Sequence, residues 1–145
     1  MSWTVLALAV DASLPSLHAA KVAGELGRAL GAEVALIAVV DRTKAVGDID
    51  AGIGIEESMM VLRKEAEQAL SQAKEALGMA AVRTLLIEGD PKHDILRAAE
   101  HVGASAIIVG THGRKGIARL IEGSVAAFII RHSTVPVVVV PQPQG

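Results

Sequence analysis

Residues 105–125 read SAIIVGTHGRKGIARLIEGSV, and this stretch decides both the fold and the place of a ligand. Four apolar residues, Ala106–Val109, are followed by Gly110, by two further glycines, and by the pair Gly123–Ser124. A buried strand that leads through a glycine-rich loop to a helix N-terminus is typical of phosphate sites, because glycine lets the backbone approach an anion and the helix end attracts it. We therefore expect the strand to end at Gly110 and a phosphate to bind beyond it.

The same region is locally basic. Residues 110–132 hold four Lys or Arg and one Glu, a local charge of +3, whereas the whole chain has a net charge of −2. Arg114, Lys115 and Arg119 either attract phosphate or form a solvated basic face, and the sequence leaves both open. His112 lies inside the loop, where it either flanks phosphates or is simply solvated.

Composition excludes several classes of function. The 145 residues are 51% hydrophobic, with one Trp, one Phe, no Tyr and no Cys. The lack of Cys excludes disulfides and thiolate chemistry, and the few aromatic residues argue against a base-stacking platform. The net charge argues against duplex binding, so we expect no nucleic-acid partner. No apolar run approaches the length of a membrane span and the N-terminus lacks a basic leader, so we expect a cytoplasmic protein.

The order of apolar patterns predicts the fold class. Unbroken apolar runs indicate buried strands, and apolar residues three and four apart indicate helices. The expected strands are 5–10, 34–40, 82–87, 106–109 and 136–141, and the expected helices are 16–30, 57–77, 91–102 and 124–131. This alternation predicts an α/β protein with a single doubly wound, five-stranded parallel sheet, forming one domain over residues 1–145. Residues 41–56 read as an irregular connection, and Met59 and Met60 read as core.

Two turns carry polar residues at the ends of expected strands. Asp11 follows the first strand and either caps the next helix or contacts a ligand. Asp90 and Pro91 form an expected helix start, with Asp90 as the N-cap. The glycine pattern is neither a Walker A loop, since no Gly-Lys-Ser/Thr follows, nor the dinucleotide fingerprint, which lies in the first βα turn.

The order of these motifs resembles that of the universal stress protein family, specifically its ATP-binding members, over nearly the whole chain. The similar segments are Val10–Ser13, Gly89–Pro91, Ile107–Arg114, Leu120–Val125 and Val135–Pro141. The resemblance implies a Rossmann-like sheet with strand order 3-2-1-4-5. The first and fourth strands would then be neighbours at the topological switch point, where open α/β sheets bind ligands.

The resemblance also implies which residues bind the nucleotide. The adenine and ribose contacts fall on Ala9, Asp11, Val39 and Gly110, with Val109 beside them. The phosphate contacts fall on Gly113, Gly123, Ser124 and Val125, with His112 and Arg114 in the same loop. A bound ATP would bring Mg²⁺ held through its phosphates and water, and we expect no metal site made by the protein itself.

The function predicted from the sequence is an ATP-binding, nucleotide-dependent regulatory module of the stress response, with protein partners that the sequence does not name. We assign no catalytic residue, because no nucleophile–base pair or carboxylate pair is evident. Two alternatives stay open: a weak ATPase or a nucleotidyl- or phosphoryl-transfer enzyme using the same pocket, and a structural dimer that binds nothing. We expect strand 137–140 to pair with a second copy, because this apolar edge carries no Lys or Glu.

Overall fold

The computed structural model describes residues 2–11, 17–45, 52, 54–80, 82–111 and 125–141. The strands are β1 (Val5–Ala9), β2 (Glu33–Val40), β3 (Val82–Glu88), β4 (Ala106–Thr111) and β5 (Val137–Pro141). The helices are α1 (Leu17–Leu30), α2 (Ile55–Leu77), α3 (Pro91–His101) and α5 (Val125–His132), with a short 3₁₀ helix, η1 (Arg42–Lys44).

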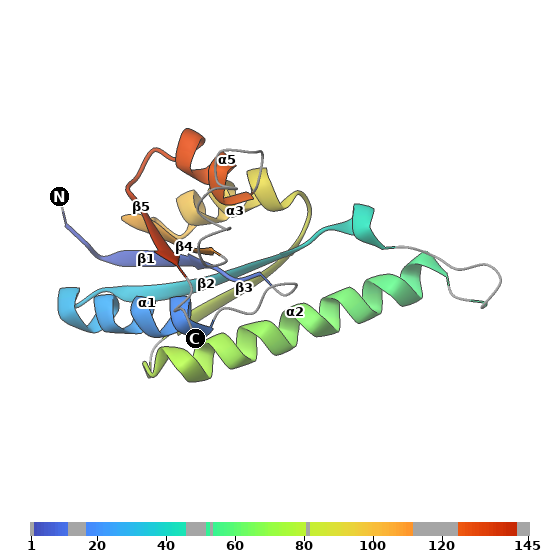
Figure 1. The fold of residues 1–145 in the computed structure, drawn as a ribbon, viewed down its shortest axis with the longest axis horizontal. Coiled ribbons are helices and arrows are strands. Elements are labelled where there is room, and N and C mark those ends of the chain that lie inside the picture. The colour runs from blue at the N-terminus through green and yellow to red at the C-terminus, as the bar shows by residue number, and fades with distance from the viewer. Residues whose placement is uncertain are drawn as a thin grey trace.

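The strands form one parallel sheet in the order β3-β2-β1-β4-β5, which confirms the predicted topology. Figure 1 shows α1 and α2 along one face of this sheet and α3 and α5 along the other. The chain therefore winds from β1 outward to β3 on one side, and then from β4 to β5 on the other. The reversal falls between β1 and β4.

Side chains of the central strands alternate between two apolar clusters, one on each face of the sheet. Leu6 and Leu8 of β1 point to the cluster under α1 and α2, whereas Ala7 points to the cluster under α3 and α5. Both clusters consist mainly of Val, Ile, Leu and Ala, because parallel strands covered by helices on both faces have no polar side. None of the helices in the described part of the chain combines the length and apolar composition needed to cross a bilayer.

Two expectations about β4 and the long connection were wrong. β4 does not end at Gly110: the strand continues to Thr111, because Gly110 pairs with Val140 and Thr111 with Pro141 of β5. The connection after β2 contains η1, and α2 begins at Ile55, earlier than expected. The apolar stripe alone could not reveal these additions, since both η1 and the first turn of α2 are exposed.

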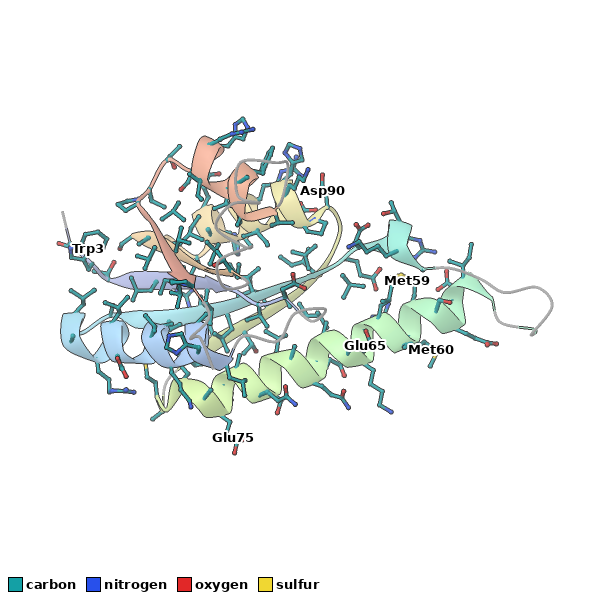
Figure 2. The ribbon with its side chains drawn as sticks, viewed as in Figure 1. Trp3, Met59, Met60, Glu65, Glu75 and Asp90 are labelled. Carbon is teal, nitrogen blue, oxygen red and sulfur yellow. The ribbon has the colours of Figure 1, made fainter. Side chains whose placement is uncertain are left out.

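The two adjacent methionines of α2 have opposite environments. Met59 is fully buried against the sheet, whereas Met60 is 65% exposed, so the expectation that both belong to the core was wrong for Met60. One residue along a helix turns the side chain by about 100°, which carries Met60 away from the sheet. Figure 2 labels both residues on α2.

A close contact between α1 and α2 depends on Gly24. Gly24 is buried in α1, and the end of α2 lies directly over it. Arg28, one turn later, donates from Nη1 to the carbonyl oxygen of Leu77 at 3.1 Å, which satisfies a C-terminal carbonyl of α2. The absence of a side chain at Gly24 therefore permits both the helix contact and this capping hydrogen bond.

We expect Gly24→Ala to destabilise the protein, because overpacking a core usually costs about 1–3 kcal/mol. The new Cβ would lie 2.1 Å from the Leu77 carbonyl oxygen, so α1 and α2 must separate. This loss should exceed the gain of about 1 kcal/mol that alanine normally brings to a helix interior. Thermal or urea unfolding followed by circular dichroism measures the change. The control is Glu25→Ala, on the exposed side of α1, and a Gly24→Ala protein as stable as this control would contradict the prediction.

Candidate nucleotide site at the carboxyl edge of the sheet

The candidate site is built on the carboxyl ends of β1 and β4, which lie side by side. The two strands pair in parallel, with Leu6 opposite Ala106 and Leu8 opposite Ile108. The helix that follows β1, α1, lies on one face of the sheet, and the described helix that follows β4, α5, lies on the opposite face, so the chain changes sides between these two strands. Such a reversal point is where open α/β sheets bind ligands.

Backbone pairing holds the end of β1 in line with the sheet. The N–H of Val10 donates to the carbonyl oxygen of Ile37 at 2.8 Å, which extends the β1–β2 pairing past the last strand residue. Asp11 follows immediately and is exposed at this edge. Gly110 lies in β4 next to β1, so the structure brings Asp11 and Gly110 to the same edge, as the sequence predicted from the strand order.

Three small apolar residues predicted for the site share one face. Ala9 of β1, Val39 of β2 and Val109 of β4 all belong to the cluster that α3 and α5 cover. Val109 is 3% exposed, while Ala9 and Val39 are only partly buried. These positions lie near the carboxyl ends of three adjacent strands and form one apolar face there, on which Ala9 and Val39 keep some exposure.

Thr111, the last residue of β4, lies at the same edge and is not among the residues predicted from the sequence. Its side chain is 6% exposed, and it is the buried polar residue among the described positions whose Oγ1 has no hydrogen-bond partner. A buried hydroxyl without a partner costs free energy, because it has lost its hydrogen bonds to water. The sequence does contain a feature that could have identified this residue: Thr111 is a polar residue at the end of an otherwise apolar strand, directly before the glycine-rich segment.

The N-terminus of α5 faces the same edge. α5 links β4 to the parallel strand β5, so it must run back from the carboxyl edge to the amino edge. Val125, its first residue and a predicted site residue, packs against the α3/α5 cluster. The positive end of the helix dipole therefore points toward the ends of β1 and β4.

The carboxylates at the ends of the other strands have structural roles. Asp41 accepts a hydrogen bond from the Thr43 N–H at 2.9 Å and caps η1. Asp90 accepts from the Lys92 N–H at 3.0 Å and caps α3, as predicted. Asp11 differs from these two aspartates in its place, because it follows β1 at the switch point itself.

An ion pair joins α2 to the far end of this edge. Arg63 of α2 donates to the carboxylate of Glu88, the last residue of β3. This hydrogen bond, together with the attraction between the opposite charges, lowers the pKa of Glu88 below its ordinary value and raises that of Arg63. Both side chains are about 40% exposed, so water screens the pair and we assign it to positioning α2 rather than to chemistry.

Several predicted residues lie outside the described part of the chain: His112, Gly113, Arg114, Gly123 and Ser124. Within the described part, no group of three or more His, Asp or Glu residues could hold a metal ion. The described histidines include His93 of α3 and His132 of α5, whose rings both contact the ring of Phe128. A separate hollow of about 210 Å³ lies between these helices, near the opposite end of β4 at Ile107.

Comparisons with known proteins agree with this arrangement. Residues 4–141 match the model of the universal stress protein family. Universal stress protein MJ0531 of Methanocaldococcus jannaschii is 35% identical over 141 residues, covering 96% of this chain and 82% of that protein. The structure of protein MJ0577 from the same organism superposes with a TM-score of 0.78 at 26% identity and full coverage of both chains.

A structure of the universal stress protein from Archaeoglobus fulgidus in complex with dAMP has the same fold, with a TM-score of 0.64 at 23% identity. The alignment covers 96% of this chain and 98% of that one. The family match spans all five strands and every helix described above. The chain therefore belongs to the universal stress protein family.

Proposed function

We propose that this protein is a nucleotide-binding regulatory module that holds ATP across the carboxyl ends of β1 and β4. The observation that carries the proposal is the adjacency of these two strands at the reversal point of the sheet, with Asp11 and Gly110 at the same edge. The fold is shared with a protein that was solved in complex with dAMP, an adenine nucleotide, and this supports an adenine nucleotide as the ligand here.

The proposed adenine position is the apolar surface formed by Ala9, Val39 and Val109. These side chains lie on one face of three neighbouring strands, and covering the partly exposed Ala9 and Val39 with a flat ring would remove apolar area from water. Asp11 and Gly110 flank this surface, so we assign them to the ribose. A carboxylate at Asp11 can accept hydrogen bonds from ribose hydroxyls.

The proposed phosphate position is the loop between β4 and α5. Its residues Gly113, Gly123 and Ser124 lie outside the described part of the chain, so this part of the proposal depends on the sequence pattern. The described support is the direction of α5, whose N-terminal Val125 faces the carboxyl edge with the positive end of the helix dipole. His112 and Arg114 would flank the phosphates, and Mg²⁺ would bind through phosphate oxygens.

We further propose that nucleotide occupancy changes the shape or the partner choice of the protein during the stress response. Residues 1–145 act as one domain in this proposal, and the protein works in the cytoplasm, where ATP is available. A timed ATP-to-ADP assay, with and without cell extract, separates this binding role from slow ATP hydrolysis. Recovery of ATP unchanged over many binding lifetimes supports the binding role.

The first test measures the nucleotide bound to the purified protein and the ATP affinity of variants in the glycine-rich loop. Purified protein should release adenine nucleotide on denaturation, detected by absorbance and mass spectrometry. Gly113→Val or Gly123→Val should weaken ATP binding at least tenfold, which corresponds to about 1.4 kcal/mol, because a branched side chain then occupies the path of the phosphate. Isothermal titration calorimetry provides the affinities.

The matched control is Gly116→Val, which changes a glycine of the same loop that is not part of the proposed contact pattern. Its ATP affinity should stay within about threefold of the wild type. Equal losses in all three variants, or no loss in any, would contradict the assignment of the phosphates to Gly113 and Gly123.

Asp11→Ala should weaken ATP binding by about 1–3 kcal/mol if the carboxylate contacts the ribose. The matched control is Asp41→Ala, which removes the corresponding carboxylate at the end of β2, where it caps η1. This control should lower thermal stability and leave the affinity unchanged. If Asp11→Ala behaves like the control, Asp11 is only a helix cap.

We also propose a homodimer through β5, which lies at one edge of the sheet. The other edge strand, β3, carries the exposed charged residues Arg83 and Glu88, which oppose pairing with another chain. By contrast, Val137–Val140 is entirely apolar, and three of its four residues are only partly buried. A two-fold axis beside β5 would pair the strand with its own copy and cover these side chains.

Light scattering over a dilution series should give twice the mass of the 15.0 kDa monomer. Val138→Lys should yield monomers that still bind ATP, because a buried lysine at the pairing edge is costly. Circular dichroism checks that the variant is folded, since Val138 also packs against the core. Leu30→Lys, an exposed apolar residue at the end of α1, is the control and should stay dimeric. If the Val138→Lys protein is still dimeric, the interface is not formed by β5.

A further inference from the structure

The hydroxyl of Thr111 is unexplained by the packing around it. β4 is otherwise made of Ala, Ile, Val and Gly, and a valine would fill the space of Thr111 without a polar atom. In the described part of the chain, Thr111 Oγ1 is buried and has no hydrogen-bond partner, with only 6% of the residue exposed. A buried polar group that lacks a partner destabilises the free protein. The hydroxyl is therefore available to a partner from outside the protein.

Strand alternation fixes the face on which Thr111 lies. Ile107 and Val109 of β4 belong to the cluster under α3 and α5, whereas Ile108 belongs to the opposite cluster. Thr111 continues the first series, because β4 still pairs regularly with β5 through Thr111 and Pro141. The hydroxyl therefore lies on the α5 side of the sheet, at the carboxyl edge that the N-terminus of α5 faces.

Two features that attract an anion thus lie at this edge of the sheet. The N-terminal end of α5 carries the positive end of a helix dipole. The Thr111 hydroxyl can donate one hydrogen bond, and hydrogen bonds to charged acceptors are shorter and stronger than those between neutral groups. The apolar surface of Ala9, Val39 and Val109 lies on the same face toward β2, so Thr111 lies at the phosphate end of the proposed site rather than at the adenine end.

We propose that Thr111 Oγ1 donates a hydrogen bond to a phosphate oxygen of the bound nucleotide. This inference rests on the proposed function and adds to it a side-chain donor from the strand itself. The hydroxyl has a hydrogen-bond partner only in the complex. Thr111 therefore lowers the stability of the nucleotide-free protein and raises its affinity for the nucleotide. Thr111 is in this sense a specificity-determining residue, because it favours phosphorylated nucleosides over adenosine.

The test compares Thr111→Val with Thr111→Ser in nucleotide-free protein, titrated separately with ATP and with adenosine. Thr111→Val should lose tenfold to a hundredfold in ATP affinity, the range for hydrogen bonds to charged groups, and should bind adenosine within about twofold of the wild type. Thr111→Ser keeps the hydroxyl and should retain most of the ATP affinity. Thr84→Val, which removes an exposed hydroxyl from β3, is the matched control and should change neither affinity.

A second readout separates this role from a structural one. Without nucleotide, the Tm of Thr111→Val should equal or exceed that of the wild type, because the substitution removes an unsatisfied buried group. A fall of more than about 3 °C would mean that the hydroxyl has a partner within the protein and would overturn the proposal. Unchanged ATP affinity in Thr111→Val would also overturn it while leaving the proposed function intact. A wild-type protein that binds neither ATP nor adenosine would overturn both.

Discussion

The structure depends on the pairing of β1 with both β2 and β4. A strand in the middle of a parallel sheet must form backbone hydrogen bonds on both sides and bury side chains on both faces. Leu6, Ala7 and Leu8 meet this demand, since each is at most 2% exposed. Because both faces of β1 need cover, the connecting helices divide between them, and this division creates the reversal point between β1 and β4.

The candidate site follows from that reversal rather than from any single residue. After β2 and β3, a helix begins directly at the strand end: Asp41 caps η1 after β2, and Asp90 caps α3 after β3. Between β1 and β4 the following helices lie on opposite faces, so neither closes the strand ends of the other. The same edge also receives the N-terminus of α5, which makes it favourable for a ligand that combines an apolar ring with negative charge.

Gly24 and Thr111 are both unfavourable in their local surroundings: Gly24 is a glycine inside a helix, and Thr111 is a buried hydroxyl at the end of an apolar strand. Gly24 is a poor helix former, but the Leu77 carbonyl group occupies the space that a side chain would need, so the packing of α1 on α2 accounts for it fully. No contact in the described structure accounts for the Thr111 hydroxyl in the same way. Folded proteins keep unfavourable local features, such as a buried hydroxyl without a partner, mainly where function requires them. This is the reason to assign a functional role to Thr111 and a packing role to Gly24.

The sequence by itself determined the order of strands and helices, the apolar character of both faces of the sheet, and the α3 cap at Asp90, because these depend on neighbouring residues and on short periodicities. The strand order and the residues at the switch point could be predicted through the family resemblance. Only the tertiary structure decided that β4 continues to Thr111 and that Met60 faces solvent. It also showed that the Thr111 hydroxyl has no hydrogen-bond partner among the described residues. These features depend on the pairing of β4 with β5 and on how α2 packs on the sheet, which join elements distant along the chain, so no local pattern could specify them.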